Sequence, residues 1–234
     1  MKTAFLTLAL AAASLTAVAQ STAVASAARP ATTAAASTGY SDLMAATITE
    51  LLGTGDPAQL KQLASKFERA STVAPADWLP SYYQAYALMI VAFQSKEAEE
   101  ARDKYLDQAE AALARAGKLG GDASERLVLQ AYIYQARLGI SPMMRSMKYS
   151  RLVTEALEEA KKHNPNNPRI YLVQANNLYY TPKMFGGGAE AAKPHYEQAK
   201  AKFAAFKPAN ALAPNWGERQ VLGRLKQYDA TAAK

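Results

Sequence analysis

The chain has 234 residues, of which 50% are hydrophobic, and it carries 27 basic and 20 acidic side chains. This composition supplies enough apolar material for a core and excludes a chain that is disordered throughout. The absence of cysteine excludes disulfide scaffolds, thiol catalysis and cysteine-ligated metal centres.

Residues 1–19 have the pattern of a secretory signal peptide. Lys2 provides the positive charge, an uncharged run rich in Leu and Ala covers residues 4–19, and Ala17-Val18-Ala19 supplies a small-residue cleavage site. A lipoprotein needs a cysteine after this site, and the chain has none. We therefore expect a mature protein that is periplasmic or secreted and does not span the membrane.

Residues 20–39 consist mainly of Ala, Ser and Thr. Such a segment buries too little side chain to offset the entropy lost when its backbone is ordered. We therefore predict a disordered leader over residues 20–39 and a folded domain over residues 40–230.

The domain shows helical patterning from end to end. Segments rich in Ala, Leu, Glu, Lys and Gln alternate with Gly and Pro breaks, and no alternation with a period of two appears. The pattern predicts four helix pairs and a ninth helix, over residues 42–52, 57–71, 78–94, 96–116, 122–138, 142–163, 168–180, 189–206 and 215–228.

An internal repeat is visible in the first helix of successive pairs. Gln84-Ala85-Tyr86, Gln130-Ala131-Tyr132 and Gln174-Ala175-Asn176 recur at intervals of 46 and 44 residues. The second helices share another spacing, in which a small or apolar residue is followed four positions later by a large one and three positions after that by Ala. Four sets fit this rule: Leu63, Phe67 and Ala70; Ala109, Leu113 and Ala116; Val153, Leu157 and Ala160; Ala192, Tyr196 and Ala199.

This register resembles the tetratricopeptide (TPR) repeat, in which small residues let helices approach closely and large ones fill the space between pairs. The resemblance covers residues 42–206 and implies an all-α, right-handed α-solenoid of about four TPR-like pairs plus a C-terminal capping helix. The intervals of 46 and 44 residues exceed the usual 34, and Ser81 stands where a bulky residue is expected. An unrelated helical bundle is the alternative.

Four motifs near the C-terminus carry a narrower resemblance: Tyr179-Tyr180-Thr181-Pro182, Phe185-Gly186-Gly187-Gly188, Tyr196-Glu197-Gln198-Ala199 and Pro214-Asn215-Trp216-Gly217. Together they resemble exported bacterial TPR-like proteins. The Phe-Gly-Gly turn before a helix also resembles the T-component of TRAP-type solute transporters. Neither resemblance brings a catalytic motif.

In TPR proteins the first helix of each pair lines the concave face. This register predicts a Tyr-rich binding groove, because tyrosine combines an apolar ring with a hydrogen-bonding end. The alternative is that these tyrosines pack between repeats. The candidate residues are Tyr82, Tyr86, Met89, Tyr132, Gln135, Asn176 and Tyr179.

No catalytic residues, metal ligands or cofactor are predicted. His163 and His195 are isolated from one another in the sequence, and no nucleophile and base pair is recognisable. The leading hypothesis is a non-enzymatic scaffold that binds a protein, a peptide or a small ligand, and a solute-binding accessory subunit of a transport system is the alternative. Nucleic acid is not expected as a partner, because no reading motif is present.

Overall fold

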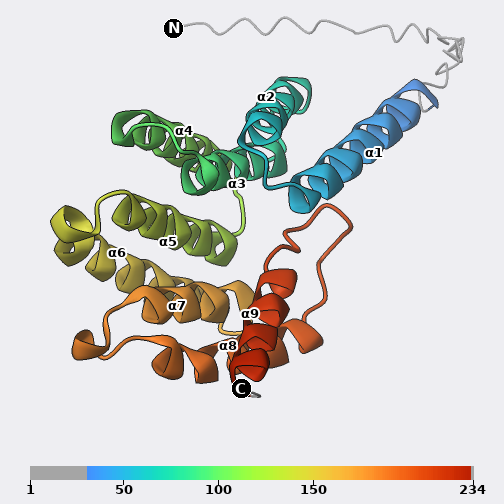
Figure 1. Cartoon of the computed structure of the whole chain (residues 1–234). Helices are drawn as coiled ribbons and strands as arrows, with labels where there is room; N and C mark the ends of the chain where they lie inside the picture. Colours follow the sequence, from blue (N-terminus) through green and yellow to red (C-terminus); the bar gives the residue numbers. More distant parts are fainter. Residues whose placement is uncertain (1–30, 233–234) are drawn as a thin grey trace, which may run out of the picture.

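The computed structural model describes residues 31–232, and the predicted signal peptide lies outside this range. Within it the chain is all-helical, with nine α-helices, one 3₁₀ helix and no strand (Figure 1). The elements are α1 (Ala31–Gly53), α2 (Pro57–Val73), α3 (Leu79–Gln94), α4 (Glu99–Lys118), α5 (Ala123–Ile140), α6 (Pro142–His163), α7 (Pro168–Tyr180), η1 (Lys183–Phe185), α8 (Ala189–Ala205) and α9 (Glu218–Ala232).

Local sequence signals determine where several helices begin. Asp56, Asp122 and Asn167 cap α2, α5 and α7 by accepting hydrogen bonds from backbone N–H groups of the first turn. Proline occupies the first turn of α6 and α7, where its fixed φ suits the helix and its missing N–H costs nothing. The predicted bounds of these two helices, 142–163 and 168–180, are confirmed.

The N-terminal helix differs from its prediction. Helix α1 begins at Ala31, inside the segment expected to be a disordered leader over residues 20–39. Alanine has the highest helix propensity, and the Ala-rich stretch continues the helix backwards from Tyr40. The rest of the predicted leader, residues 20–30, lies outside the described residues.

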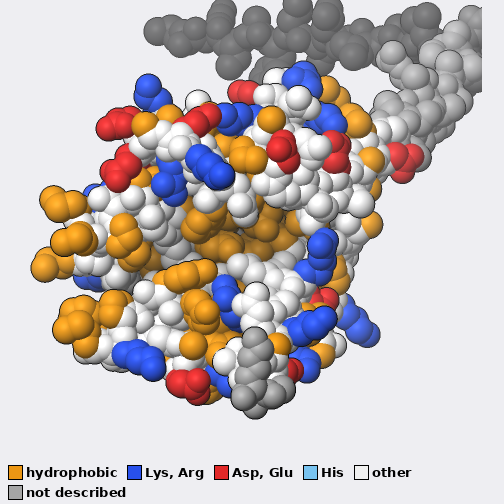
Figure 2. Space-filling model, viewed as in Figure 1, with side chains coloured by type: hydrophobic (Ala, Val, Ile, Leu, Met, Phe, Trp, Pro, Cys, Tyr) orange, Lys and Arg blue, Asp and Glu red, His pale blue; other side chains and the backbone are white. Residues whose placement is uncertain are grey.

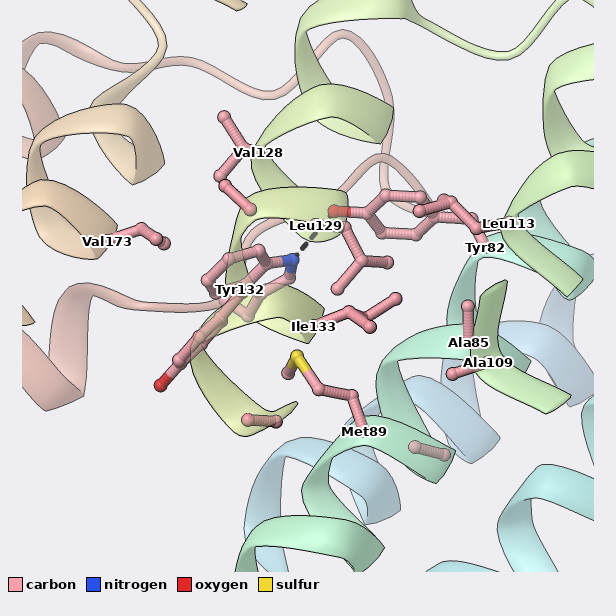
Figure 3. Packing of buried hydrophobic residues seen from close by; sticks show 14 of the residues in the cluster. Tyr82, Ala85, Met89, Ala109, Leu113, Val128, Leu129, Tyr132, Ile133 and Val173 are labelled. Atoms are coloured by element: carbon pink, nitrogen blue, oxygen red, sulfur yellow. Dashed lines mark hydrogen bonds between the residues drawn. The ribbon is translucent and has the colours of Figure 1, made fainter. Parts of the chain in front are cut away.

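Each helix packs mainly against its neighbours in sequence, and α3 also contacts α5, which in turn contacts α7 (Figure 1). The repeated alanines lie at these contacts, because Ala85, Ala131 and Ala175 have no exposed surface. The twelve residues of the second-helix sets are buried as well. In Figure 3, Met89 of α3 and Ile133 of α5 extend toward each other between these helices. None of the described helices is both long and apolar enough to cross a bilayer.

Candidate functional site

A groove with a volume of about 1820 Å³ lies between the end of α1, helices α3, α5, α6 and α7, and the start of α9. Figure 2 shows it as a hollow with hydrophobic side chains at its bottom. Its apolar and aromatic lining comprises Leu51, Leu52, Tyr86, Ile90, Phe93, Tyr132, Leu138, Pro142, Met143, Met147, Leu178, Tyr180, Pro182, Phe185 and Trp216.

Four of these residues, Tyr86, Phe93, Tyr132 and Trp216, form an aromatic floor. The ring centroid of Trp216 lies 4.9 Å from that of Tyr86 and 5.8 Å from that of Tyr132, and Phe93 lies 5.3 Å from Tyr132. Offset contacts at these separations are favourable between aromatic rings. The rings come from α3, α5 and the C-terminal segment, so the floor exists only when these parts of the chain are assembled.

Trp216 reaches the floor because the chain returns to the groove after α8. The carbonyl oxygen of Leu212 accepts a hydrogen bond from the Tyr83 hydroxyl at 3.0 Å, and Arg219 donates to the carbonyl oxygen of Leu52 at 3.2 Å. Gly217 makes the turn into α9 with φ +109°, and a Cβ atom there would meet the side chain of Leu172 at 2.7 Å. A glycine is therefore required directly after Trp216.

Beneath the floor lies a buried cluster of Tyr82, Glu125, Asn167, Arg169 and Trp216. The indole N–H of Trp216 donates to the Tyr82 hydroxyl at 2.9 Å (the dashed line in Figure 3), and Tyr82 donates to Glu125 at 3.3 Å. Burial, reinforced by the charge of Glu125, raises the pKa of Tyr82 well above its usual value. The hydroxyl therefore keeps its proton and holds Trp216 in place.

Arg169 and Glu125 form the charged part of this cluster. The Arg169 side chain is wholly buried, and two of its nitrogens donate to the Glu125 carboxylate, Nε at 2.8 Å from Oε2. Burial disfavours the charge of Arg169, but attraction to Glu125 and the hydrogen bonds with it outweigh this and raise its pKa. The guanidinium also lies over the ring of Trp216, 5.7 Å from its centroid. The pair thus joins α5 and α7 to the C-terminal segment.

Of the residues predicted to line a groove, Tyr86, Tyr132, Gln135 and Asn176 do so. Their polar groups are largely engaged within the protein. Gln135 donates to the carbonyl oxygen of Val173 at 2.6 Å. The Tyr132 hydroxyl accepts from the side-chain nitrogen of Gln220 at 3.0 Å, and the side-chain oxygen of Asn176 accepts from the Tyr196 hydroxyl at 2.7 Å. The aromatic rings, more than these polar ends, therefore face the groove.

The other three predicted residues are placed elsewhere. Tyr82 and Met89 have no exposed surface and lie in the core behind the floor. The packing of α3 against α5 covers both side chains, and Trp216 also covers Tyr82. Tyr179 is not among the groove-lining residues, and the Arg224 guanidinium lies 4.1 Å from its ring centroid. The alternative that some tyrosines pack between repeats holds for Tyr82.

Sequence reasoning missed Phe93, Met143, Met147 and Trp216. Phe93 follows Tyr86 by seven residues, two helical turns, so extending the helical face by one step would have included it. The position of Trp216 depends on its hydrogen bond with Tyr82, which lies 134 residues away in the sequence. No local sequence pattern predicts this contact.

The charged groups of the groove are few. Arg102 and Arg219 line it together with one carboxylate, Glu218. Neither histidine belongs to the lining, and the described residues contain no group of three His, Cys, Asp or Glu side chains suited to a metal ion. Burial and the neighbouring charge of Lys161 lower the pKa of His195. The groove is therefore an apolar, aromatic site with cationic groups at its edge.

Comparison with known proteins identifies a relative. No protein-family model and no curated protein sequence matches the chain. Among solved structures, the HusA haemophore from Porphyromonas gingivalis is 35% identical, with a TM-score of 0.73, over 82% of this chain and 94% of HusA. The chain belongs to the HusA family. Because nearly all of HusA has a counterpart here, the two proteins share their overall helical fold.

Proposed function

We propose that this protein is an exported, non-enzymatic carrier that binds haem or a related tetrapyrrole in the groove. The observation that carries the proposal is the aromatic floor in a member of the HusA family, whose namesake is a haemophore. The relationship favours a small-ligand carrier over the protein scaffold and the transport accessory subunit that the sequence also allowed.

The shape and lining of the groove suit a large flat ring. Ligand pockets commonly enclose about 300–1,000 Å³, and this groove, at 1820 Å³, exceeds that range. A tetrapyrrole presents two wide π-faces, which stack favourably on aromatic side chains. Phe93, with 36% of its surface exposed, is the floor ring most open to such a ligand.

The edge of the groove suits the carboxylates of a tetrapyrrole. Arg102 and Arg219 each direct one nitrogen to a backbone carbonyl, of Ala92 and Leu52, and a guanidinium has further N–H groups to donate. The lining contains no histidine or cysteine, and the side chains in it that can ligate haem iron are those of tyrosine and methionine, such as Tyr180 and Met147. We propose that contacts of the aromatic floor with the ring faces carry most of the affinity.

The proposal includes a TPR-like α-solenoid as the framework of the groove. Its support is the series of contacts from α3 to α5 to α7, with Ala85, Ala131 and Ala175 buried at equivalent positions. Stacked pairs of this kind produce an extended concave surface. Tyr86 and Tyr132 follow their alanines directly and both reach the groove.

The test is a titration of the mature protein with haemin, in which binding is measured by the absorbance of the bound pigment. Phe93→Ala should weaken binding about fivefold or more, since contacts central to an interface commonly contribute more than about 1 kcal/mol. Leu119→Ala is the matched control, because Leu119 is 37% exposed and lies outside the groove. Metal-free protoporphyrin in a parallel titration separates the contribution of the ring from that of the iron.

A wild-type protein that fails to bind both pigments would refute the proposal. Equal losses in Phe93→Ala and Leu119→Ala would show that the ligand binds elsewhere.

Export is tested separately, by the mass of the native protein, which should lack residues 1–19. An intact Met1 would contradict it.

A further inference from the structure

Three methionines at the start of α6 are exposed to an unusual degree. Met143, Met144 and Met147 expose 96%, 84% and 92% of their surface, whereas Met44 and Met89 expose none and lie in the core. Three of the seven methionines of the chain thus fall within five residues. Large apolar side chains that gather on a surface usually serve an interaction. In Figure 2, hydrophobic side chains project from the left edge of the molecule, where α6 begins in Figure 1.

Helical geometry brings the three side chains together. At 3.6 residues per turn, positions 143, 144 and 147 fall within an arc of about 100° on one turn, with Met147 between the other two. Residues four apart have Cβ atoms separated by about 5–6 Å. A methionine side chain has three rotatable bonds and adapts its shape easily. The three sulfur atoms can therefore converge on one point above the helix without any change in the backbone.

Arg145, the charged side chain between the methionines, is held away from this turn. Arg145 lies between the methionines in sequence, but its guanidinium donates to both carboxylate oxygens of Asp103 on α4, at 2.7 and 2.6 Å. Lys148 is the next cation along the chain, and its amine lies 5.1 Å from the ring centroid of Tyr149. The positive charge of Arg145 is therefore compensated and held toward α4, on a different part of the helix surface.

We propose that Met143, Met144 and Met147 bind one Cu(I) ion through their thioether sulfurs. Thioethers are neutral, soft ligands that favour Cu(I) over Mg²⁺, Ca²⁺ or Mn²⁺, which prefer oxygen. Three neutral donors suit a singly charged ion. This site does not rest on the proposed function, but it shares two side chains with the groove, because Met143 and Met147 also belong to the groove lining.

The test asks whether Cu(I) binding needs the thioether sulfurs or only apolar side chains at these three positions. Full-length protein is titrated anaerobically with Cu(I) in competition with a coloured Cu(I) chelator. The variant Met143→Leu/Met144→Leu/Met147→Leu keeps apolar side chains of similar volume at exposed positions, so the fold should persist. We expect the wild type to bind one equivalent and the triple variant to bind at least tenfold more weakly. Met184→Leu is the control, because Met184 is 83% exposed but belongs to η1; it should retain the wild-type affinity.

A second measurement identifies the ligands directly. With Ag(I) as a redox-stable substitute, the methyl NMR signals of Met143, Met144 and Met147 should shift, while that of the buried Met89 should not. Equal competition by the wild type and the triple variant would overturn the proposal, as would a shift confined to other methionines. Haemin titration of the wild type reports on the proposed function independently, so failure of one proposal leaves the other intact.

Discussion

Two clusters of charged side chains join helices in this protein, and they differ in burial. The buried cluster links α3, α5, α7 and the C-terminal segment through Glu125 and Arg169, whose side chains are 10% and 0% exposed. A surface network links α4, α5 and α6 through Arg137 and Arg145, whose side chains are 9% and 23% exposed. The difference lies mainly in their carboxylate partners on α4, which are 24–67% exposed. The same ion-pair chemistry therefore operates in two different environments.

The difference determines what each cluster contributes. A buried pair gains little over apolar packing, but a single partner left alone is strongly destabilising, because a charge then lacks both water and a counter-ion. An exposed pair exchanges water for a partner at little net gain. We infer that the buried cluster fixes the position of the C-terminal segment, whereas the surface network, whose carboxylates keep part of their hydration, contributes a smaller increment to stability.

The largest effect is expected for Arg169→Met. This substitution leaves the Glu125 carboxylate buried without its counter-ion and should lower the free energy of unfolding by about 3–5 kcal/mol. Urea denaturation measures it. The double variant Glu125→Leu/Arg169→Met should recover most of the loss, because no charge remains buried. A loss below about 1 kcal/mol in the single variant would contradict the burial of this pair.

A smaller effect is expected for Tyr82→Phe. The substitution removes the hydroxyl between Trp216 and Glu125, leaves the indole N–H without its partner, and should cost about 1–3 kcal/mol. Tryptophan fluorescence should also change, because the indole loses its hydrogen bond. Tyr83→Phe on the same helix is the control, since its hydroxyl binds the Leu212 carbonyl and not Trp216. Identical spectra for both variants would argue against the role of Tyr82.

The smallest effect is expected for Arg145→Met, which removes one cation of the surface network and should cost about 0.2–1 kcal/mol at neutral pH. Hydrogen bonds from Arg145 hold the pKa of Asp103 below its usual value. A carboxylate with a lowered folded-state pKa stabilises the protein above its unfolded pKa, about 3.9, and loses this contribution as the pH falls through the folded value. The difference in stability between wild type and variant should therefore shrink below about pH 4. A difference that grows in acid would contradict this assignment.

The helices were predictable because their signals are local. Proline at residues 142 and 168 begins α6 and α7, and the regular spacing of Ala85, Ala131 and Ala175 coincides with positions that are buried in the fold. The start of α1 differs from the prediction because a composition poor in large side chains indicates a disordered leader, whereas the alanines of this segment favour a helix.

The candidate site was only partly predictable. Tyr86 and Tyr132 were identified because the repeat register places both on the concave side. Tyr82 was misplaced because its exposure depends on Trp216, a residue that reaches it from another part of the chain. The pairing of Glu125 with Arg169 was not predicted either. These residues are 44 positions apart, the same interval as Gln130 and Gln174, but an equivalent place in the repeat does not by itself indicate that two side chains form an ion pair.

The return of the C-terminal segment also sets an order of assembly. Trp216 meets Tyr82 across 134 positions, and Arg219 meets Leu52 across 167. Contacts between residues so distant in sequence form late, because closing a long loop costs entropy before any contact offsets it. In a chain made from its N-terminus, helices α2 to α8 are complete before Trp216 is added. The groove is therefore finished last, and a nascent or C-terminally truncated chain lacks Trp216, the ring that joins Tyr86 and Tyr132 in the floor.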